Sequence, residues 1–509
     1  MSNSAILLAI DIGATSVKTG AFSLDGKLLT SASAPNAPKP QPDAPPEWRI
    51  WDVEEIWNSI CGCSKKVMSE LGGAPEVRGV AVTGFGADGV PMSKEEKQLY
   101  PCISWHCGRT AAQAEKVSEI LGRKAIYQTT GYHNYSINTL NRFLWLQENQ
   151  PQVLEQAAYW LHVQDYIVYR LTGQFSTELT IASTMMCLDL PKRTWAEEML
   201  AKVGIPAHFL SPLHDSGARV GEVTKAAAET SGIPAGTVVA TGGHDTELAV
   251  IGSGIHSKET FLDINGTWEI LMAVTDFCRP SDADFSHGLD WECHAAPGWW
   301  NCQALMIAGG VIEWVRNQFY RECSSYDVLI KEAAEAPLGA NNVYLLPAFV
   351  RGMGPSQAYD PLGTILGINT QTDRRDIARA LFEGLSYQTY QQIGAIEQSL
   401  GVKAESIRAA GGGQKNPFWM QMKADMCGRS LDVLQDVEAT MLGAAILAGI
   451  GGGVYRDIAD ALSHISIPVD SVEPIAEAHE RYVERFDKTA SKIPQNLESV
   501  YRVIHSYRE

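Results

Sequence analysis

A strand–turn–strand pattern that occurs twice in the chain sets the strongest limit on its fold. An apolar run and an alternating segment over 6–21 flank the small-residue turn Gly13-Ala14-Thr15-Ser16. A second such pattern over 260–274 flanks Asn265-Gly266-Thr267. Alternating hydrophobicity around turn residues predicts a β-hairpin at each place. Because the arrangement repeats with little overall identity, the sequence predicts two related halves.

Both turns place glycine next to threonine. Glycine lets the backbone approach a phosphate closely, and the exposed N–H groups and the threonine hydroxyl can donate to phosphate oxygens. Two such turns could hold one polyphosphate from both sides. The alternative is structural, because Asn-Gly-Thr is also a common turn of ordinary hairpins.

The rest of the chain alternates helical and strand patterns, which predicts the α/β class. Helical periodicity covers 53–71, 138–148 and 376–400, and strands include 79–82 and 237–240.

The length of 509 residues exceeds what one hydrophobic core usually supports, so two domains are expected. We place the boundary near Gly252–Lys258, which gives an N-terminal domain over 1–253 and a C-terminal domain over 254–509. The proline cluster over 35–46 is interpreted as a surface loop rather than a linker.

Composition excludes several classes of protein. Hydrophobic residues make up 45% and charged residues 20%, as in a globular enzyme. The net charge of −18 opposes binding to nucleic acid and to anionic membranes. No signal peptide or transmembrane run is recognised, so a cytoplasmic location is expected. Ten scattered cysteines, with Cys61 and Cys63 the nearest pair, suggest neither a disulfide framework nor a zinc site.

Three segments offer the groups that phosphoryl transfer needs, namely a phosphate cradle, a carboxylate for Mg²⁺ and a general base. Asp11 ends a buried strand beside the first turn and could reach Mg²⁺, or it could form an Asx turn. Asp245 follows an apolar strand and Gly242-Gly243, which suits a general base or a helix N-cap equally. The cluster over 410–416 has a strand–glycine–helix pattern, typical of nucleotide binding, but matches neither a Walker A loop nor a GxGxxG motif.

The segments DIGATSVKTG, GGHDT, NGTWEILM, AGGVIEW and AGGGQKN occur in the order and spacing of the FGGY sugar kinases, and the chain resembles that family over nearly its whole length. Two family signatures are also present, over 135–146 and 363–383. The first carries Arg142 where the family usually has lysine. Cys107 stands where xylulose kinases usually have aspartate, which argues against that subfamily.

The resemblance implies two actin-like, ribonuclease-H-like domains with ATP and sugar in the cleft between them. It implies ATP-dependent phosphorylation of a sugar hydroxyl, with ATP and Mg²⁺ as cofactors, Asp245 as the base and Asp11 near the metal. The nucleotide-binding residues would be Gly13, Ala14, Thr15, Gly266, Thr267, Gly310, Gly412 and Asn416. The sugar-binding residues would be Gly86, Asp88, Arg109, His244, Thr246 and Trp268.

Structural roles remain open for some of these residues: Arg109 could be an internal ion-pair partner, Trp268 a core residue and Asp88 a turn former. The first domain is expected to supply most sugar contacts and the second most nucleotide contacts. The expected partner is a small-molecule sugar, and a homodimer is allowed. The alternatives are a kinase for another ketose or polyol, such as rhamnulose, ribulose or xylulose, an actin-like ATPase, and a non-catalytic sugar sensor.

Overall fold

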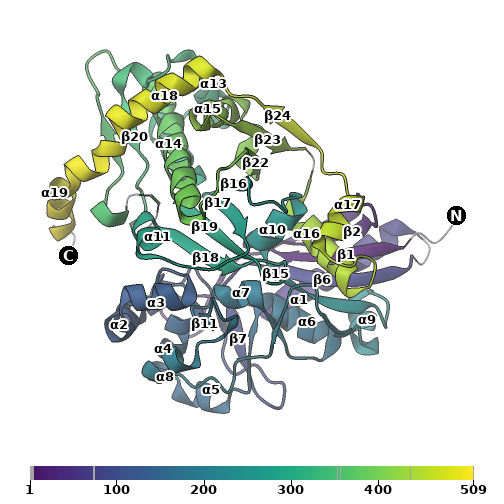
Figure 1. The fold of residues 1–509 in the computed structure, drawn as a ribbon. Helices are drawn as coiled ribbons and strands as arrows, with labels where there is room; N and C mark the ends of the chain where they lie inside the picture. The colour runs from purple at the N-terminus through teal and green to yellow at the C-terminus, as the bar shows by residue number, and fades with distance from the viewer. Residues whose placement is uncertain (1–4, 73–74, 352–353, 356, 436, 508–509) are drawn as a thin grey trace.

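The computed structural model describes residues 5–72, 75–351, 354–355, 357–435 and 437–507. Two mixed β-sheets, each flanked by helices, form the body of the molecule (Figure 1). The predicted α/β class is therefore confirmed. No helix within the described ranges is long and apolar enough to cross a membrane.

The first sheet has six strands in the order β14-β15-β6-β1-β2-β3. Strand β1 pairs with β2 in the antiparallel sense and with β6 in the parallel sense, and β6 pairs in parallel with β15. The predicted first hairpin is therefore present. The strands are β1 (Ile6–Ile12), β2 (Ser16–Ser23), β3 (Leu28–Pro35), β6 (Val77–Gly84), β14 (Arg219–Glu222) and β15 (Val238–His244).

The second sheet has seven strands in the order β18-β19-β17-β16-β22-β23-β24. Its β16 pairs antiparallel with β17 and parallel with β22, just as β1 pairs with β2 and β6. The shared pairing pattern confirms the prediction of two related halves. The strands are β16 (Thr260–Asn265), β17 (Trp268–Thr275), β18 (Leu289–Cys293), β19 (Trp300–Ile307), β22 (Ser406–Ala410), β23 (Ser430–Leu434) and β24 (Val469–Val472).

The helices that matter most for the site follow strands of these sheets. Helix α10 (Asp245–Gly252) follows β15, and α15 (Pro417–Cys427) follows β22. The predicted helix over 53–71 is α1 (Val53–Leu71), which begins where the side chain of Asp52 accepts a hydrogen bond from the Glu55 backbone N–H at 3.0 Å. An Asp at this position satisfies one of the free N–H groups of the first turn.

The other two helices expected from the sequence are also present, as α4 (Thr139–Asn149) and α14 (Arg374–Leu400). The remaining α-helices are α2 (Ala111–Leu121), α3 (Arg123–Thr130), α5 (Pro151–Gln156), α6 (Val163–Thr172), α7 (Leu179–Ser183), α8 (Glu197–Lys202), α9 (Lys225–Ser231), α11 (Asp282–His287), α12 (Gly309–Phe319), α13 (Asp327–Glu335), α16 (Ala439–Gly451), α17 (Ile458–His464), α18 (Ala476–Lys488) and α19 (Ile493–Ser506).

The remaining short strands form smaller, separate sheets. These are β4 (Lys39–Pro40), β5 (Arg49–Trp51) and β8 (Cys102–Ile103) in one sheet, and the pairs β7 (Gly89–Met92) with β9 (Tyr159–His162), β10 (Thr177–Glu178) with β13 (Leu213–His214), β11 (Leu188–Asp189) with β12 (Thr194–Trp195), and β20 (Tyr344–Leu346) with β21 (Thr364–Leu366).

Helix α16 comes late in the chain, yet it packs against the first sheet. Its Ala444 and Leu447 share one buried apolar cluster with Leu7 of β1 and Ala240 of β15. Glycines allow the backbones of α16 and α10 to touch: a Cβ on Gly443 would lie 2.1 Å from the Leu248 carbonyl oxygen. The contact fixes α10 on one side, and the first residue of α10 is Asp245.

Candidate active site

A cavity of about 700 Å³ lies between the two halves. We call it the cleft cavity. Asp11, Lys18 and Asp245 line it from the first half, and Gly412 and Lys415 line it from the second. The Lys18 ammonium also forms a 2.9 Å ion pair with Glu438, another lining residue. The two acidic residues singled out from the sequence therefore face the same space.

Asp11 belongs to strand β1 itself, so the alternative of an Asx turn does not apply. Burial raises the pKa of its carboxyl to about 7, and the nearby carboxylates of Asp245 and Glu438 add to the rise, while Lys18 opposes it. A cation placed here would relieve the repulsion between these acids. Carboxylate oxygens are the protein ligands that Mg²⁺ prefers, and they usually act together with phosphate oxygens and water.

The rest of the site is consistent with a metal that has few protein ligands. Among the described residues no group of three or more His, Cys, Asp or Glu side chains could hold a metal by itself. Asp11 therefore fits a metal that arrives with the nucleotide, rather than one held in a cage of protein ligands.

Asp245 is the first residue of α10, and the N-cap position belongs to His244. Its alternative interpretation as an N-cap is therefore wrong by one residue. The side chain of Asp245 is 32% exposed. Burial raises the pKa of its carboxyl, and the neighbouring His244 opposes the rise. An accessible carboxyl at the start of a helix, in a cavity shared with the carboxyl of Asp11, can accept a proton from a bound hydroxyl.

His244 connects Asp245 to a buried acid of the other half. Its Nδ1 lies 2.9 Å from Glu292 Oε2, and its Nε2 lies 3.4 Å from Asp245 Oδ1. Glu292 is fully buried on β18, where its other oxygen accepts hydrogen bonds from Tyr132 Oη and from Gln303 Nε2 at 2.6 Å. Burial disfavours the charged imidazole, but Glu292, Asp245 and Glu247 outweigh it and raise the pKa of His244 to about 9.

A pH dependence of turnover follows. His244 carries its proton below about pH 9 and then faces Asp245 as a cation, so we expect kcat to fall as pH rises through about 9. In Glu292→Gln the main attraction for that proton is lost while burial remains. The alkaline limb of a plot of log kcat against pH should therefore move toward lower pH. If the alkaline limb of this variant stayed at the wild-type position, Glu292 would not be the residue that raises the pKa of His244.

A second cavity, of about 800 Å³, adjoins the first and shares Gly412 and Lys415 with it. We call it the glycine-lined cavity. Its lining includes Gly266, Thr267 and Gly310. Gly309 must stay small, because a Cβ there would lie 2.6 Å from the Gly266 carbonyl oxygen. Gly411 has φ of +84°, and its Cβ would lie 2.7 Å from the Asn265 carbonyl oxygen. The glycines therefore let three separate segments meet around one space.

The walls of the glycine-lined cavity suit a nucleotide. Asn416 lines it and caps α15, accepting a hydrogen bond from the Trp419 backbone N–H at 3.1 Å. Ile312, Ile330 and Phe382 provide apolar surface. A phosphate cradle next to an apolar slot is what a nucleoside triphosphate requires.

The residues of the first turn, Gly13, Ala14 and Thr15, do not line the cleft cavity or the glycine-lined cavity. Gly13 donates its N–H to the Ser16 carbonyl at 2.9 Å, which closes the turn, and Thr15 is exposed. Asp11 and Lys18 are the residues of this hairpin that line the cleft cavity. The phosphate roles predicted for Gly13, Ala14 and Thr15 stay predictions.

Two of the predicted sugar-binding residues, Gly86 and Asp88, lie against side chains of the first half. Asp88 is fully buried: its carboxylate accepts hydrogen bonds from Trp51 Nε1 at 2.5 Å and from the Trp105 N–H at 2.9 Å, and it lies 2.6 Å from Arg142 Nη2. Gly86 lies against Thr184, where a Cβ would be 2.9 Å from the threonine methyl group.

Arg109 is held inside the first half. Its guanidinium lies 4.0 Å from the ring centre of Trp48, and its Nη1 donates to Gln41 Oε1 at 2.8 Å. Thr246 lines the cleft cavity, with its hydroxyl 3.1 Å from His244 Nδ1, and Trp268 is half-buried at the start of β17. Direct sugar contacts for these residues stay predictions.

Several charged residues that the fold brings to the site were not found from the sequence. Lys18, Lys415 and Glu438 line the cleft cavity, and Glu292 supports His244. Lys18 and Lys415 lie within the quoted motifs DIGATSVKTG and AGGGQKN, so the motifs themselves carried a signal. Glu292 lies in a run over 289–293 whose alternation shows only a strand, and its role appears only once the halves are placed together.

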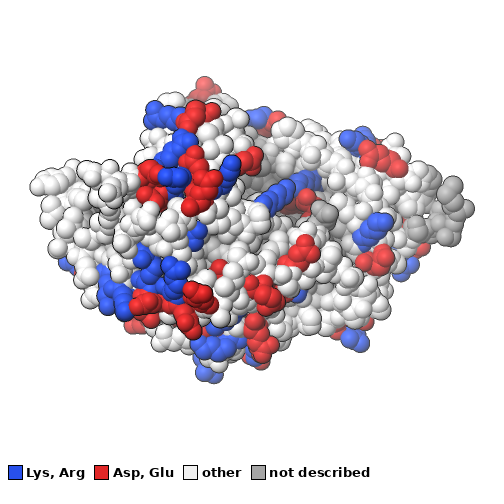
Figure 2. Space-filling view, turned by 90° about the horizontal axis from the view of Figure 1, so that it is seen from above, with Lys and Arg blue, Asp and Glu red and all other residues white. Residues whose placement is uncertain are grey.

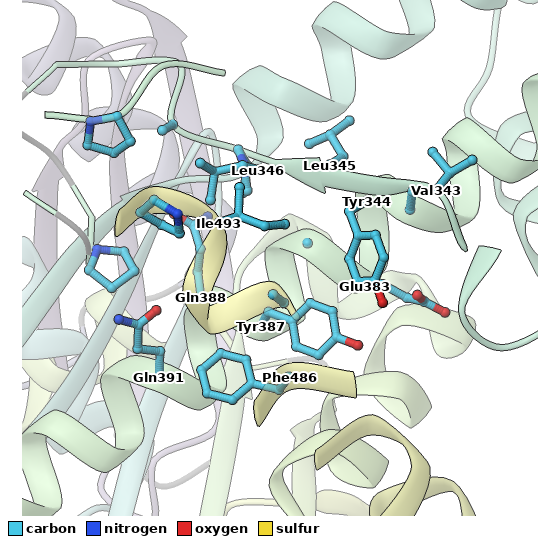
Figure 3. A pocket seen from close by; sticks show the side chains of 18 residues that line it. Val343, Tyr344, Leu345, Leu346, Glu383, Tyr387, Gln388, Gln391, Phe486 and Ile493 are labelled. Atoms are coloured by element: carbon cyan, nitrogen blue, oxygen red, sulfur yellow. The ribbon is translucent and has the colours of Figure 1, made fainter. Parts of the chain in front are cut away.

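A separate small cavity is lined by residues of α14, β20, α18 and α19 (Figure 3). Its volume is about 40 Å³, and its lining includes Leu346, Tyr387, Gln388 and Phe486. That volume suits one or two water molecules, which could satisfy the Tyr387 hydroxyl and the Gln388 amide, both without a partner among the described residues. It is too small for a sugar or a nucleotide.

This chain resembles known kinases. Residues 6–252 match the N-terminal domain of the FGGY family of carbohydrate kinases, and residues 264–452 match its C-terminal domain. The L-fuculokinase of Escherichia coli (strain K12) is 34% identical over 463 residues, which cover 90% of this chain and 95% of that protein. An autoinducer-2 kinase of Klebsiella pneumoniae is 26% identical, covering 95% of this chain and 92% of the relative.

The fold is shared with solved structures of lower identity. The crystal structure of xylulose kinase from Rhodospirillum rubrum superposes with a TM-score of 0.87 at 22% identity, covering 98% of this chain and all of that one. The likeness confirms the predicted two-domain, actin-like fold.

Proposed function

The chain belongs to the FGGY family of carbohydrate kinases, and we propose that it phosphorylates L-fuculose with ATP to give L-fuculose 1-phosphate. Phosphorylation of a sugar hydroxyl with ATP and Mg²⁺ is the activity of the family. The observation that supports the proposed chemistry best is that Asp11 and Asp245 line one cavity that adjoins the glycine-lined cavity. The choice of sugar rests on the 34% identity to L-fuculokinase over most of both chains.

In the proposed mechanism, Asp245 accepts the proton of the sugar O1 hydroxyl as that oxygen attacks the γ-phosphorus of ATP. Asp11 would hold Mg²⁺, which offsets negative charge on the phosphates when bound. Protonated His244 favours the ionised form of Asp245 and lies 3.4 Å from its Oδ1, which leaves Oδ2 for the sugar. Lys18 and the Gly266–Thr267 turn would donate to the phosphate oxygens, stabilising the charge of the transferring group.

We further propose that the sugar and the nucleotide are bound by different domains, with the boundary at residue 253. Residues 1–253 would hold the sugar, with Thr246 and His244 in direct contact and Asp88 supporting the pocket from beneath. Residues 254–509 would hold the nucleotide through Gly266, Thr267, Gly310, Gly412 and Asn416. Helix α16 is an element of the second part that covers the first sheet.

The surface gives no reason to expect a polyanionic partner. Acidic and basic side chains are interspersed on the face seen in Figure 2, and the net charge is −18. We propose a cytoplasmic enzyme whose partner is its sugar, with a homodimer as the assembly to be tested.

The product tests the proposal. With ATP, Mg²⁺ and L-fuculose, we expect the signals of ADP and a new phosphomonoester signal in proton-coupled ³¹P NMR, and the two protons on C1 should split that phosphomonoester signal into a triplet. Phosphorylation of a ring or chain CHOH group would give a doublet instead and would refute the 1-phosphate. Release of inorganic phosphate alone would favour an actin-like ATPase.

A further inference from the structure

A lysine is buried without solvent contact beneath the Gly266–Thr267 turn. The Lys423 side chain on α15 is 0% exposed. Its ammonium donates to Asp263 Oδ2 at 2.6 Å, to Asn265 Oδ1 at 2.5 Å and to Glu269 Oε1 at 2.9 Å. All three partners belong to one hairpin, since Asp263 and Asn265 lie on β16 and Glu269 on β17.

The hydrogen bonds of Lys423 join the two strands of the hairpin. Asn265 and Glu269 are direct partners across the β16–β17 ladder, and Gly266 and Thr267 form the turn between the strands. One ammonium therefore joins both sides of the hairpin just below the turn that lines the glycine-lined cavity. Thr389 of α14 donates to the same Glu269 oxygen at 2.5 Å, which links the hairpin to a second helix.

The same lysine reaches the other wall of that cavity. Its Nζ lies 4.4 Å from the ring centre of Trp419, which also lines the cavity. A Cβ on Gly413 would lie 2.8 Å from the Asn265 Cβ and 2.9 Å from the Trp419 ring. Asn265, Trp419 and the glycine cluster are therefore in mutual contact around the Lys423 ammonium.

A cluster of buried charges does not by itself stabilise a fold. A buried ion pair is often no more stable than apolar residues of the same volume, because both charges lose their hydration. Here one lysine and two carboxylates are buried, and Asp263 Oδ1 and Glu269 Oε2 have no hydrogen-bond partner among the described residues. Burial, with Asp263 adding to it, raises the pKa of Glu269 to about 7, and Lys423 opposes the rise. Stability alone does not account for this arrangement.

The two halves differ in the surroundings of an equivalent aspartate. Asp11-Ile12 ends β1 and Asp263-Ile264 occupies the corresponding place in β16, the strand with the same pairing pattern in the second sheet. Asp11 lines the cleft cavity, whereas Asp263 is fully enclosed and paired with Lys423. The second half therefore neutralises its aspartate with an internal cation.

We propose that Lys423 is a positioning residue for the nucleotide: it holds the Asn265-Gly266-Thr267 turn and the glycine cluster over 411–413 at the separation that a triphosphate chain needs. This inference rests on the proposed placement of the nucleotide in the glycine-lined cavity. It does not depend on which sugar is the substrate.

The test compares three variants by calorimetric titration with ADP and by steady-state kinetics. Lys423→Met should weaken ADP binding and lower kcat/KM for ATP by about tenfold to a hundredfold, as expected when a phosphate cradle shifts by about 1 Å. KM for the sugar should stay within about twofold, because the ammonium of Lys423 contacts neither His244 nor Thr246, the residues proposed to contact the sugar directly.

Two further variants separate positioning from stability. The triple variant Lys423→Met, Asp263→Asn, Glu269→Gln removes the buried charges together and should fold even if the single variant does not. Arg379→Met removes another buried cation of the second half. Arg379 Nε lies 2.9 Å from Glu383 Oε1, and neither residue lines the glycine-lined cavity. We expect weak ADP binding in the triple variant and wild-type ADP binding in Arg379→Met. Wild-type ADP affinity in the folded triple variant would overturn the proposal. Weakened binding in Arg379→Met would equally overturn it, since the effect would then follow from stability.

Discussion

Asp245→Asn is expected to lower kcat by about two to four orders of magnitude, the usual contribution of a positioned acid–base group. The amide has the shape of the carboxylate but cannot accept the proton of the sugar hydroxyl. Asp245 lines the cleft cavity, whereas the glycine-lined cavity is formed by other residues. Binding of ADP should therefore remain close to wild type, and calorimetric titration with ADP beside a kcat measurement separates the two effects.

Glu247→Gln is the matched control for this variant. Glu247 lies two residues further along α10 and is fully buried, with its carboxylate near Asn301 and His294. Burial raises the pKa of Glu247 well above its ordinary range. Glu247 does not line the cleft cavity, and the amide keeps the size of the side chain, so the exchange alters a neighbouring acid on the same helix without altering a group that faces the bound sugar. We expect kcat of Glu247→Gln close to wild type. Wild-type turnover in Asp245→Asn would remove Asp245 from the mechanism.

Gly443→Val is expected to reduce both stability and turnover. The new Cβ would lie 2.1 Å from the Leu248 carbonyl oxygen, so α16 and α10 must separate. Overpacking of this kind costs about 3 kcal/mol or more when backbone has to move, and a fall of about 5 °C or more in Tm should follow. Because α10 carries Asp245, a shift of about 1 Å should also lower kcat by about a hundredfold.

The control is a helical glycine without close neighbours. A Cβ added to Gly394 in α14 would have nothing within 4 Å, so Gly394→Ala should leave Tm unchanged or raise it slightly, as alanine favours helix. Differential scanning fluorimetry and kcat can be measured on both variants. A Gly443→Val protein with wild-type Tm and kcat would show that the α10–α16 contact does not position Asp245.

The elements of the fold were largely predictable from the sequence because their signals are local. The two hairpins follow from alternation, and α1 and α14 follow from helical periodicity, within single segments. Helix α16 was not placed by these signals. Its apolar run shows that it is buried, but the sequence does not say that it covers the first sheet, because that depends on contacts with residues more than 400 positions earlier, such as Leu7.

The sequence predicted the acids and glycine clusters of the candidate site, but not the contacts between distant residues. Asp11, Asp245 and the glycine clusters stand in recognisable turns, and the structure brings both acids to one cavity. Asp88 and Arg109 are predicted from motifs to contact the sugar, and that prediction remains untested. The sequence did not show their internal neighbours, which are Arg142 for Asp88 and Trp48 for Arg109. Lys423 looks like an ordinary helix residue in the sequence, because its carboxylate partners lie more than 150 residues away.

Transfer of phosphate from ATP to L-fuculose in this cleft can be tested by ADP release with Mg-ATP. The sugars to compare are L-fuculose, L-rhamnulose, L-ribulose, D-xylulose and glycerol, each measured against a blank without sugar. We predict the highest kcat/KM for L-fuculose and little release in the blank. A higher kcat/KM for another sugar would contradict the assignment of the substrate, and release that no sugar stimulates would contradict the proposed kinase activity altogether.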